Sequence, residues 1–229
     1  MHRSASTALS AAVLAALTIS GCSGGKAAAG DPGPSPTAAV KTAPAAKPAA
    51  PLTSAALAER LLDEADLGQG YTRKPQTGSS RDDVTVIGCP ALERLGSDAA
   101  AGGSLNFPNS AKVTFSYARG TSSEVAEELY SDTEDKLDPG TKTVFKAMTA
   151  CPLYQVVVGD TPIAVATQKL PAPALGDEAR SQLLTFTASG RDTVMKQTAV
   201  RAGSVLVVVS GSPALVDTHL NRAVDKAHG

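Results

Sequence analysis

The sequence predicts an α+β fold: a single domain in which helices pack on an antiparallel β-sheet of about five to six strands. Three observations predict it. Helical periodicity appears near both ends of the domain, a run of alternating segments fills its second half, and tight glycine-containing pairs divide that run. Separators this short favour hairpins, and hairpins make neighbouring strands antiparallel.

The opening of the domain predicts a helix. Leu57 and Leu61 are spaced as on one helical face, so residues 53–65 are expected to form an amphipathic helix. Further along, the sequence predicts a short helix with Pro90 near its first turn and Gly96 at its end.

The middle of the domain predicts a strand followed by two helical pieces. Residues 111–119 alternate apolar and polar side chains, which is typical of a half-buried strand. Thr121 and Glu124 have the spacing of a capping box, and an apolar stripe through Leu129 follows them. We therefore expect a helix from residue 121 onward, which the Pro-Gly pair at 139–140 separates from a second helical piece.

From residue 155 onward the pattern changes to strands. The separators at 190–191 and 202–203 are short enough for hairpins. Ser212 and Pro213 can begin a terminal helix. The expected strands are residues 111–119, 155–158, 163–169, 181–189, 193–201 and 205–210, and the residues before them, ending at 84–87, have only weak strand character.

Residues 1–21 are predicted to be a signal peptide of the lipoprotein type. A charged start and an apolar run too short to cross a bilayer precede Ile19-Ser20-Gly21-Cys22. These four residues resemble the lipobox of bacterial lipoproteins, which implies that Cys22 receives a lipid and becomes the N-terminus. An ordinary signal peptide with a cysteine near its cleavage site is the alternative.

Residues 22–51 are predicted to be the lipidated cysteine and a disordered tether. Beyond Cys22 they consist almost wholly of Ala, Gly, Pro, Ser, Thr and Lys, so they cannot form a core. Their prolines favour extended conformations. The folded domain is therefore expected over residues 52–229, held outside the cell membrane by two or more acyl chains.

The folded domain carries a small negative charge. Four of the 21 Lys and Arg lie upstream of residue 52, which leaves 17, and one of the 22 Asp and Glu does, which leaves 21. A net charge of 17 − 21 = −4 without a basic stripe argues against nucleic acid as a partner. The expected partners are the membrane, through the lipid, and an unknown small-molecule or envelope ligand.

The cysteines predict one disulfide. If Cys22 carries lipid, Cys89 and Cys151 remain as a pair in an oxidising compartment, so we expect a bond between them. Two buried free thiols are the alternative.

Catalysis finds little support in the sequence. Of the three histidines only His219 could join a Ser-His-Asp site, and the chain has no Gly-x-Ser-x-Gly elbow to supply the nucleophile. Cysteine and histidine spacings suited to zinc, and glycine-rich loops suited to phosphate, are absent as well. We expect a non-enzymatic domain with no catalytic residue, no metal and no cofactor.

Three charged features could contact a ligand. Acidic side chains crowd residues 124–138, Asp177 and Glu178 lie between two predicted strands, and Arg201 precedes a hairpin. A solvated helix face, ordinary turn chemistry and ordinary ion pairing explain them equally well. The ligand-binding residues therefore stay unknown at this stage.

Short segments spread over most of residues 52–229 share a family likeness. They are residues 57–62 with 66–71, 89–92, 151–153, 170–178 and 200–205. Together they resemble the PknH-like extracellular sensor domains of actinobacteria. The resemblance implies a helix-flanked antiparallel sheet that forms a cleft and binds a ligand. The family includes the extracellular domain of a protein kinase, which has two disulfides, whereas this chain has one cysteine pair. This chain also carries no kinase domain, so the resemblance implies no signalling role.

The sequence thus predicts a membrane-anchored extracytoplasmic lipoprotein with a non-enzymatic ligand-binding or sensor-like domain. A carrier of lipid or another apolar molecule is one alternative, and it requires a large apolar cavity between sheet and helices. An envelope hydrolase is another, and it requires His219 or a carboxylate pair beside a nucleophile.

Overall fold

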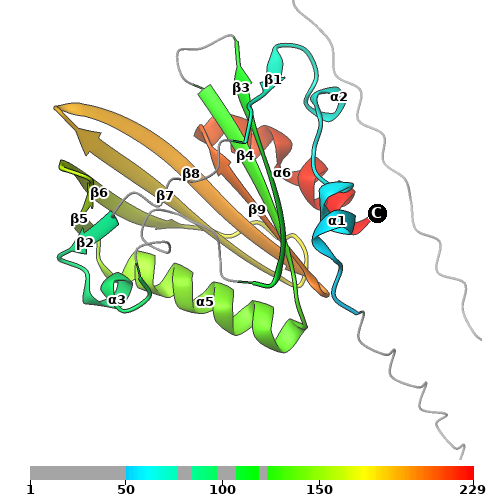
Figure 1. Ribbon diagram of the computed structural model, residues 1–229, viewed down its shortest axis with the longest axis horizontal. Coiled ribbons are helices and arrows are strands. Elements are labelled where there is room, and N and C mark those ends of the chain that lie inside the picture. The colour runs from blue at the N-terminus through cyan, green and yellow to red at the C-terminus, as the bar shows by residue number, and fades with distance from the viewer. Residues whose placement is uncertain (1–49, 77–83, 97–106, 119–122) are drawn as a thin grey trace, which may run out of the picture. The chain divides into compact units, whose positions relative to one another are not determined.

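A computed structural model of the chain describes residues 50–76, 84–96, 107–118 and 123–229. These residues form one antiparallel sheet with helices packed on it, in the strand order β1-β3-β4-β9-β8-β7-β6-β5-β2 (Figure 1). The predicted signal peptide, nearly all of the tether, Cys22 and Thr121 lie outside the described residues.

The sheet has nine strands, so the prediction of five to six is wrong. Short strands at both edges, and one strand that the sequence predicted as a helix, account for the difference. The strands are β1 Tyr71–Arg73, β2 Val84–Ile87, β3 Asn109–Tyr117, β4 Ser123–Ser131, β5 Leu153–Val158, β6 Thr161–Leu170, β7 Glu178–Ala188, β8 Arg191–Ala202 and β9 Val205–Gly211. The helices are α1 Ser54–Ala58, α2 Glu64–Leu67, α3 Pro90–Glu93, α5 Glu134–Ala150 and α6 Pro213–His228.

The helix predicted over residues 53–65 is instead two short helices, α1 and α2. The chain breaks between them because the N–H of Leu62 donates to a side chain of the sheet, Glu127 Oε2, at 2.7 Å. Asp63 then starts α2 through a capping box with Asp66.

The helix predicted from residue 121 onward is also wrong, because residues 123–131 form strand β4. Val125 and Leu129 are four residues apart, which fits a helical stripe. In β4 they are alternate inward-facing positions on either side of Glu127, and all three are buried. A buried glutamate therefore masked the alternation of a strand.

Helix α5 runs through the Pro-Gly pair at 139–140, which the sequence predicted as a divider. Pro139 lies in the second turn of α5. Gly140 is needed for close packing, because a Cβ on it would lie 2.8 Å from the ring of Phe107. The absence of a side chain here lets the ring lie against the helix.

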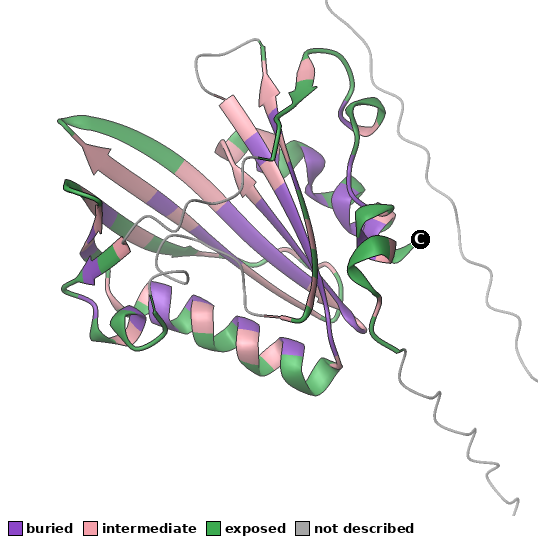
Figure 2. Ribbon diagram, in the orientation of Figure 1, coloured by how far each residue is buried: buried purple, intermediate pink, exposed green. Residues whose placement is uncertain are grey.

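The helices cover both faces of the sheet. Helix α6 packs on β4, β8 and β9, and α1 packs on β3 and β4, around an apolar cluster that includes Val207 and Leu220. Helix α5 contacts β6, β7 and β8 on the other face, and Figure 2 shows its buried residues along the side toward the sheet. None of the helices within the described ranges is long and apolar enough to cross a membrane.

The predicted disulfide is present. Cys89 and Cys151 are bonded, 62 residues apart in the sequence. The bond joins the residue before α3 to the residue after α5, so it fastens the C-terminal end of α5 beside β2 and β5.

Candidate functional site

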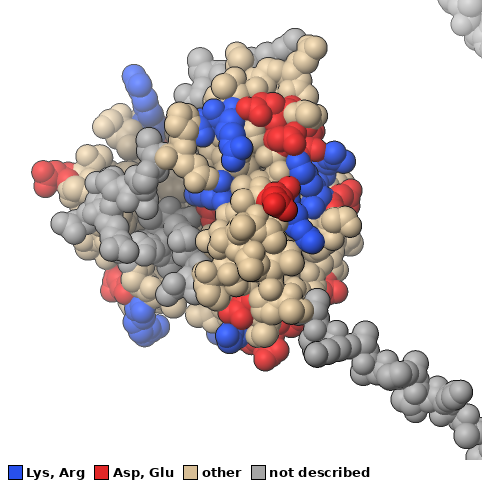
Figure 3. All heavy atoms as spheres, turned by 45° about the vertical axis from the view of Figure 1, so that its right-hand side comes forward, with Lys and Arg blue, Asp and Glu red and all other residues tan. Residues whose placement is uncertain are grey.

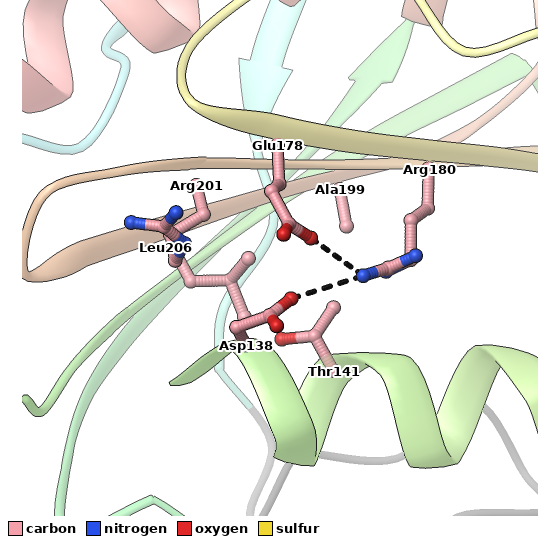
Figure 4. A pocket seen from close by; sticks show the side chains of 7 residues that line it. All are labelled: Asp138, Thr141, Glu178, Arg180, Ala199, Arg201 and Leu206. Carbon is pink, nitrogen blue, oxygen red and sulfur yellow. Dashed lines mark hydrogen bonds and ion pairs between the residues drawn. The ribbon is translucent and has the colours of Figure 1, made fainter. Parts of the chain in front are cut away.

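The three charged features that the sequence singled out meet at one place. Asp138 of α5, Glu178 at the start of β7 and Arg201 near the end of β8 surround a small cavity between the helix and the sheet (Figure 4). Its volume is about 10 Å³, which is room for roughly one water molecule. The residues around it are Asp138, Thr141, Glu178, Arg180, Ala199, Arg201 and Leu206.

Strand register explains why these side chains share one face. Glu178 is paired with Arg201, and Arg180 is paired with Ala199, in the antiparallel ladder of β7 and β8. Directly paired residues, and alternate residues along one strand, point to the same side of a sheet. Here that side is covered by α5, so the two strands present one carboxylate and two guanidinium groups to the helix.

Arg180 connects the helix to the sheet. Its Nη2 donates to Asp138 Oδ1 at 3.0 Å and to Glu178 Oε2 at 2.6 Å. Figure 4 shows both carboxylates directed toward this guanidinium. The three side chains keep between a quarter and two fifths of their surface in contact with solvent. A group in solution can therefore reach them.

Asp138 and Glu178 lie close enough to affect each other's ionisation. The hydrogen bond between the two carboxyl groups lowers the pKa of Asp138 and raises the pKa of Glu178. Burial raises both pKa values, and Arg180 lowers both. Of the two carboxyl groups, Glu178 therefore holds a proton more readily than Asp138.

Arg201 is held by the neighbouring loops. Its Nη1 donates to Asp177 Oδ2 at 3.1 Å and to the carbonyl of Gly203 at 3.3 Å. Asp177 in turn accepts from the N–H of Gly203 at 2.7 Å. The Nε of Arg201 is buried and has no hydrogen-bond partner within the described part of the chain. The cavity wall thus includes an arginine with one unused donor.

Gly176 lets the loop before β7 approach β8. Its φ of +61° lies in the left-handed region, and a Cβ would lie 2.3 Å from the carbonyl oxygen of Arg201. Only glycine fits such a position without displacing the strand. The loop therefore brings Asp177 against Arg201.

The described residues of the site offer binding groups but no free hydroxyl or thiol as a nucleophile. Among the described residues around the cavity, only Thr141 carries a hydroxyl, and that hydroxyl donates to the carbonyl of Leu137 at 2.7 Å. The described residues that line the cavity include neither histidine nor cysteine. Across the residues that the structure describes, no cluster of three or more His, Cys, Asp or Glu is arranged to hold a metal ion.

His219 lies away from this site, in α6. Its Nε2 is 2.6 Å from the hydroxyl of Tyr71, and the two rings meet edge to face. Burial lowers the pKa of His219. Its hydrogen-bond partner is thus a phenol rather than a serine or cysteine nucleophile.

A second charged cluster ties α2 to α6. Asp66 is bound by Arg222 Nη2 at 2.6 Å and by Lys226, which also reaches Asp63 at 2.9 Å. Burial opposes the shift, but the hydrogen bonds from Lys226 and Arg222 lower the pKa of Asp66 to about 2. Figure 3, which brings this side of the molecule forward, shows acidic and basic side chains interspersed. The ion pairs between α2 and α6 give these charges a structural role.

Arg180 and Thr141 are the site residues that sequence reasoning missed. Arg180 lies two residues after Glu178, and alternation along a strand would have placed both on one face. No sequence signal indicated that α5 covers that face. The structure joins Asp138, Asp177, Glu178 and Arg201, and leaves Glu124 apart, paired with Lys74.

The fold is similar to that of a known extracellular domain. The crystal structure of the extracellular domain of PknH from Mycobacterium tuberculosis matches with a TM-score of 0.58 and 15% sequence identity. The match covers 78% of this chain and 97% of that one. No protein-family model and no curated protein matches the chain. The PknH-like fold that the sequence predicted is therefore confirmed as a fold.

Proposed function

We propose that this chain is a membrane-anchored extracytoplasmic lipoprotein whose folded domain binds a ligand without changing it chemically. Its fold is similar to a domain that lies outside the cell. The lipobox-like residues before Cys22, and the proline-rich stretch after it, supply an anchor and a spacer. Together these features favour a binding domain that faces the cell envelope.

The anchor can be tested on the whole chain. Cells that express it are fed a fatty acid with an alkyne tag, and the chain is then coupled to a dye. The proposal predicts labelled protein in the membrane fraction and no label on the Cys22→Ser variant. Equal labelling of both chains, or of neither, would contradict lipid attachment at this cysteine.

The ligand site that we propose is the cavity beneath α5. The observation that carries it is the convergence of Asp138, Glu178, Arg180 and Arg201 from a helix and two strands around a space that solvent can reach. The cavity admits one small polar group, so the ligand presents such a group and lies mostly outside. The carboxyl groups of Asp138 and Glu178 and the unused Nε of Arg201 can form hydrogen bonds with it.

The two alternative functions find less support. A carrier needs a large apolar cavity, but the layer between α6 and the sheet contains closely buried side chains such as Val207, Leu220 and Ala223. A hydrolase needs an activated nucleophile, and the hydroxyl of Thr141 already donates to the backbone. The arrangement of charges supports a binding site.

Native mass spectrometry of the full chain, extracted from its own membrane in mild detergent, tests the ligand site. The proposal predicts a bound small molecule that is lost in the Arg180→Gln variant. Arg191→Gln is the matched control, because Arg191 is an exposed arginine in the hairpin at the far end of β8. A molecule that survives Arg180→Gln, or that Arg191→Gln also removes, would show that the site lies elsewhere.

A further inference from the structure

The turn between β8 and β9 lies between the candidate site and the start of the folded domain (Figure 1). Ala202 pairs directly with Val205, so the turn consists of Gly203 and Ser204 alone. Gly203 has a φ of +55°, in the left-handed region that favours glycine. One of these two residues is bound by the candidate site, and the other by the end of the predicted tether.

Gly203 is bound by the candidate site. Its N–H donates to Asp177 Oδ2 at 2.7 Å, and its carbonyl accepts from Arg201 Nη1 at 3.3 Å. The N–H of Asp177 also donates to the carbonyl of Arg201 at 2.8 Å. The arginine of the cavity wall, the loop before β7 and the first residue of the turn are therefore held together.

Ser204 is bound by the end of the tether. Its carbonyl accepts from the hydroxyl of Ser131 at 2.6 Å, and that hydroxyl accepts in turn from the N–H of Leu52 at 2.8 Å. The hydroxyl of Ser204 donates to the carbonyl of Ala50 at 3.5 Å. Ser131 is fully buried, so breaking one of its bonds leaves an unpaired polar group unless the segment moves away and admits water. These contacts are therefore made together and lost together.

The two sets of bonds share one peptide group. The carbonyl of Gly203 and the N–H of Ser204 lie in a single planar unit, which rotates as a whole. In a turn of two residues, few backbone dihedral angles separate the bonds of Gly203 from those of Ser204. A change in the bonds between Gly203 and Asp177 is therefore transmitted to the residue that holds Ser131.

The docked segment is small enough to detach by itself. Leu52 is half-buried and packs at the border of the apolar cluster between α6 and the sheet, and the contact of Ala50 with Ser204 is long. Segments with few buried contacts open locally while the rest of the fold stays intact. The segment thus has two states, docked on Ser131 and Ser204 or released from them.

We propose that this turn couples the ligand site to the tether, whose end is docked while Asp177 holds Gly203 and is released when those bonds change. This inference rests on the proposed ligand site, because a group that accepts from Nε of Arg201 draws on the guanidinium that also holds Gly203. Coupling is reciprocal, so release of the tether weakens the bonds of Asp177 in turn. Occupancy of the site is thereby passed to the segment that leads to the membrane.

Amide hydrogen exchange of the full chain in mild detergent, without added ligand, tests the coupling. Asp177→Ala removes the carboxylate that holds Gly203, and it should speed exchange in residues 50–58 about fivefold or more. Asp192→Ala is the matched control, because that aspartate accepts a hydrogen bond from Thr187 in the hairpin at the other end of β8. Unchanged exchange with Asp177→Ala, or an equal change with Asp192→Ala, would overturn the proposal.

A second variant tests the coupling in the reverse direction. Ser131→Ala should speed exchange in residues 50–58, and it should also speed exchange of the N–H of Gly203. Ser181→Ala, which removes another buried hydroxyl of the sheet, should leave both unchanged. Faster exchange in residues 50–58 alone would show docking without coupling and would overturn the proposal. If Ser131→Ala does not fold, Asp177→Ala decides by itself, because Asp177 is exposed.

These measurements contain no ligand, so they separate the coupling from ligand binding. Coupled exchange in a chain that retains no molecule in native mass spectrometry would support the coupling and count against the ligand site. A bound molecule that Arg180→Gln removes, in a chain whose exchange is not coupled, would support the ligand site and overturn the coupling.

Discussion

The main-chain N–H of Leu62 donates to Oε2 of Glu127 across the boundary between the N-terminal helical segment and the sheet, at 2.7 Å. The glutamate is 1% exposed, and its Oε1 has no partner in the described ranges. Burial raises the pKa of Glu127 to about 7, against an ordinary value of 4.5. The segment that leads to the predicted spacer is therefore docked on a carboxyl group that ionises near neutral pH.

The first prediction concerns the dependence of stability on pH. The folded chain keeps the Glu127 proton up to about pH 7, whereas the unfolded chain releases it near pH 4.5. Because the pKa of Glu127 is raised in the folded chain, its contribution to the free energy of unfolding grows as the pH falls through 7 and is complete below 4.5. The full contribution is on the order of 3 kcal/mol. Urea unfolding at pH 5 and pH 8 measures it.

The Glu127→Gln variant isolates this effect. It should be more stable than the wild-type chain at pH 8, and its stability should change less between pH 8 and pH 5. Burial lowers the pKa of His219, which contributes in the opposite direction in both chains, so only their difference reports on Glu127. A difference that does not vary with pH would contradict the raised pKa.

The second prediction concerns the attachment of α2 to α6. Asp66→Asn removes the charge that Arg222 and Lys226 share, and it leaves one acceptor oxygen where the carboxylate uses one for the N–H of Asp63 and the other for Arg222. We expect a loss of about 1 to 2 kcal/mol in the free energy of unfolding at pH 7. Because the pKa of Asp66 is lowered to about 2, the loss should shrink as the pH falls from about 4 toward 2. Asp225→Asn, on the exposed side of α6, should change the stability little.

The third prediction concerns the disulfide. Cys89 and Cys151 close a loop of 62 residues, and loop-closure entropy assigns such a bond roughly 4 kcal/mol. The double variant Cys89→Ser, Cys151→Ser should lose stability of that order in urea unfolding, and reduction of the wild-type chain should lower its midpoint similarly. If the variant and the oxidised wild-type chain unfold at the same urea concentration, the bond does not stabilise the fold.

The fourth prediction compares two glycines. Gly176 and Gly190 both have positive φ, +61° and +73°, but only at Gly176 would a Cβ meet the backbone. Gly190→Ala should therefore cost about 1 kcal/mol, for conformation alone. Gly176→Ala should cost clearly more, and it should also weaken ligand binding because it displaces Asp177 from Arg201. Equal costs would show that the loop adapts easily.

Much of the sheet was predictable from alternation and turns. The strand through Val113 and Phe115 and the terminal helix appear where the sequence predicts them, and the two hairpin turns, at residues 189–190 and 203–204, lie within one residue of the predicted separators. In each case a local pattern and the tertiary environment agree. The disulfide was predictable for a different reason, since it rests on the number of cysteines and the compartment.

Strand β4 and the break between α1 and α2 were not predictable, and both failures involve one residue. A pattern of apolar side chains cannot show that Glu127 is buried, because its partner is a main-chain N–H far away in the sequence. The same hydrogen bond interrupts the predicted helix at Leu62. Long-range polar contacts of this kind override local periodicity.

The sequence indicated several residues of the candidate site, but it did not indicate that they lie together. Asp177, Glu178 and Arg201 stood out by their positions in turns, and Asp138 belonged to an acidic stretch that a solvated helix face also explains. Their meeting depends on which face of β7 and β8 is covered by α5, and the sequence carries no signal for that.

Amide hydrogen exchange on the full chain, with and without the low-molecular-mass extract of its own envelope, tests the central claim most directly. Binding beneath α5 predicts slower exchange in the first half of α5 and at the start of β7, where Asp138 and Glu178 lie, and no such change in the Arg180→Gln variant. An unchanged exchange pattern, or slower exchange only in other elements, would contradict a ligand site at this cavity.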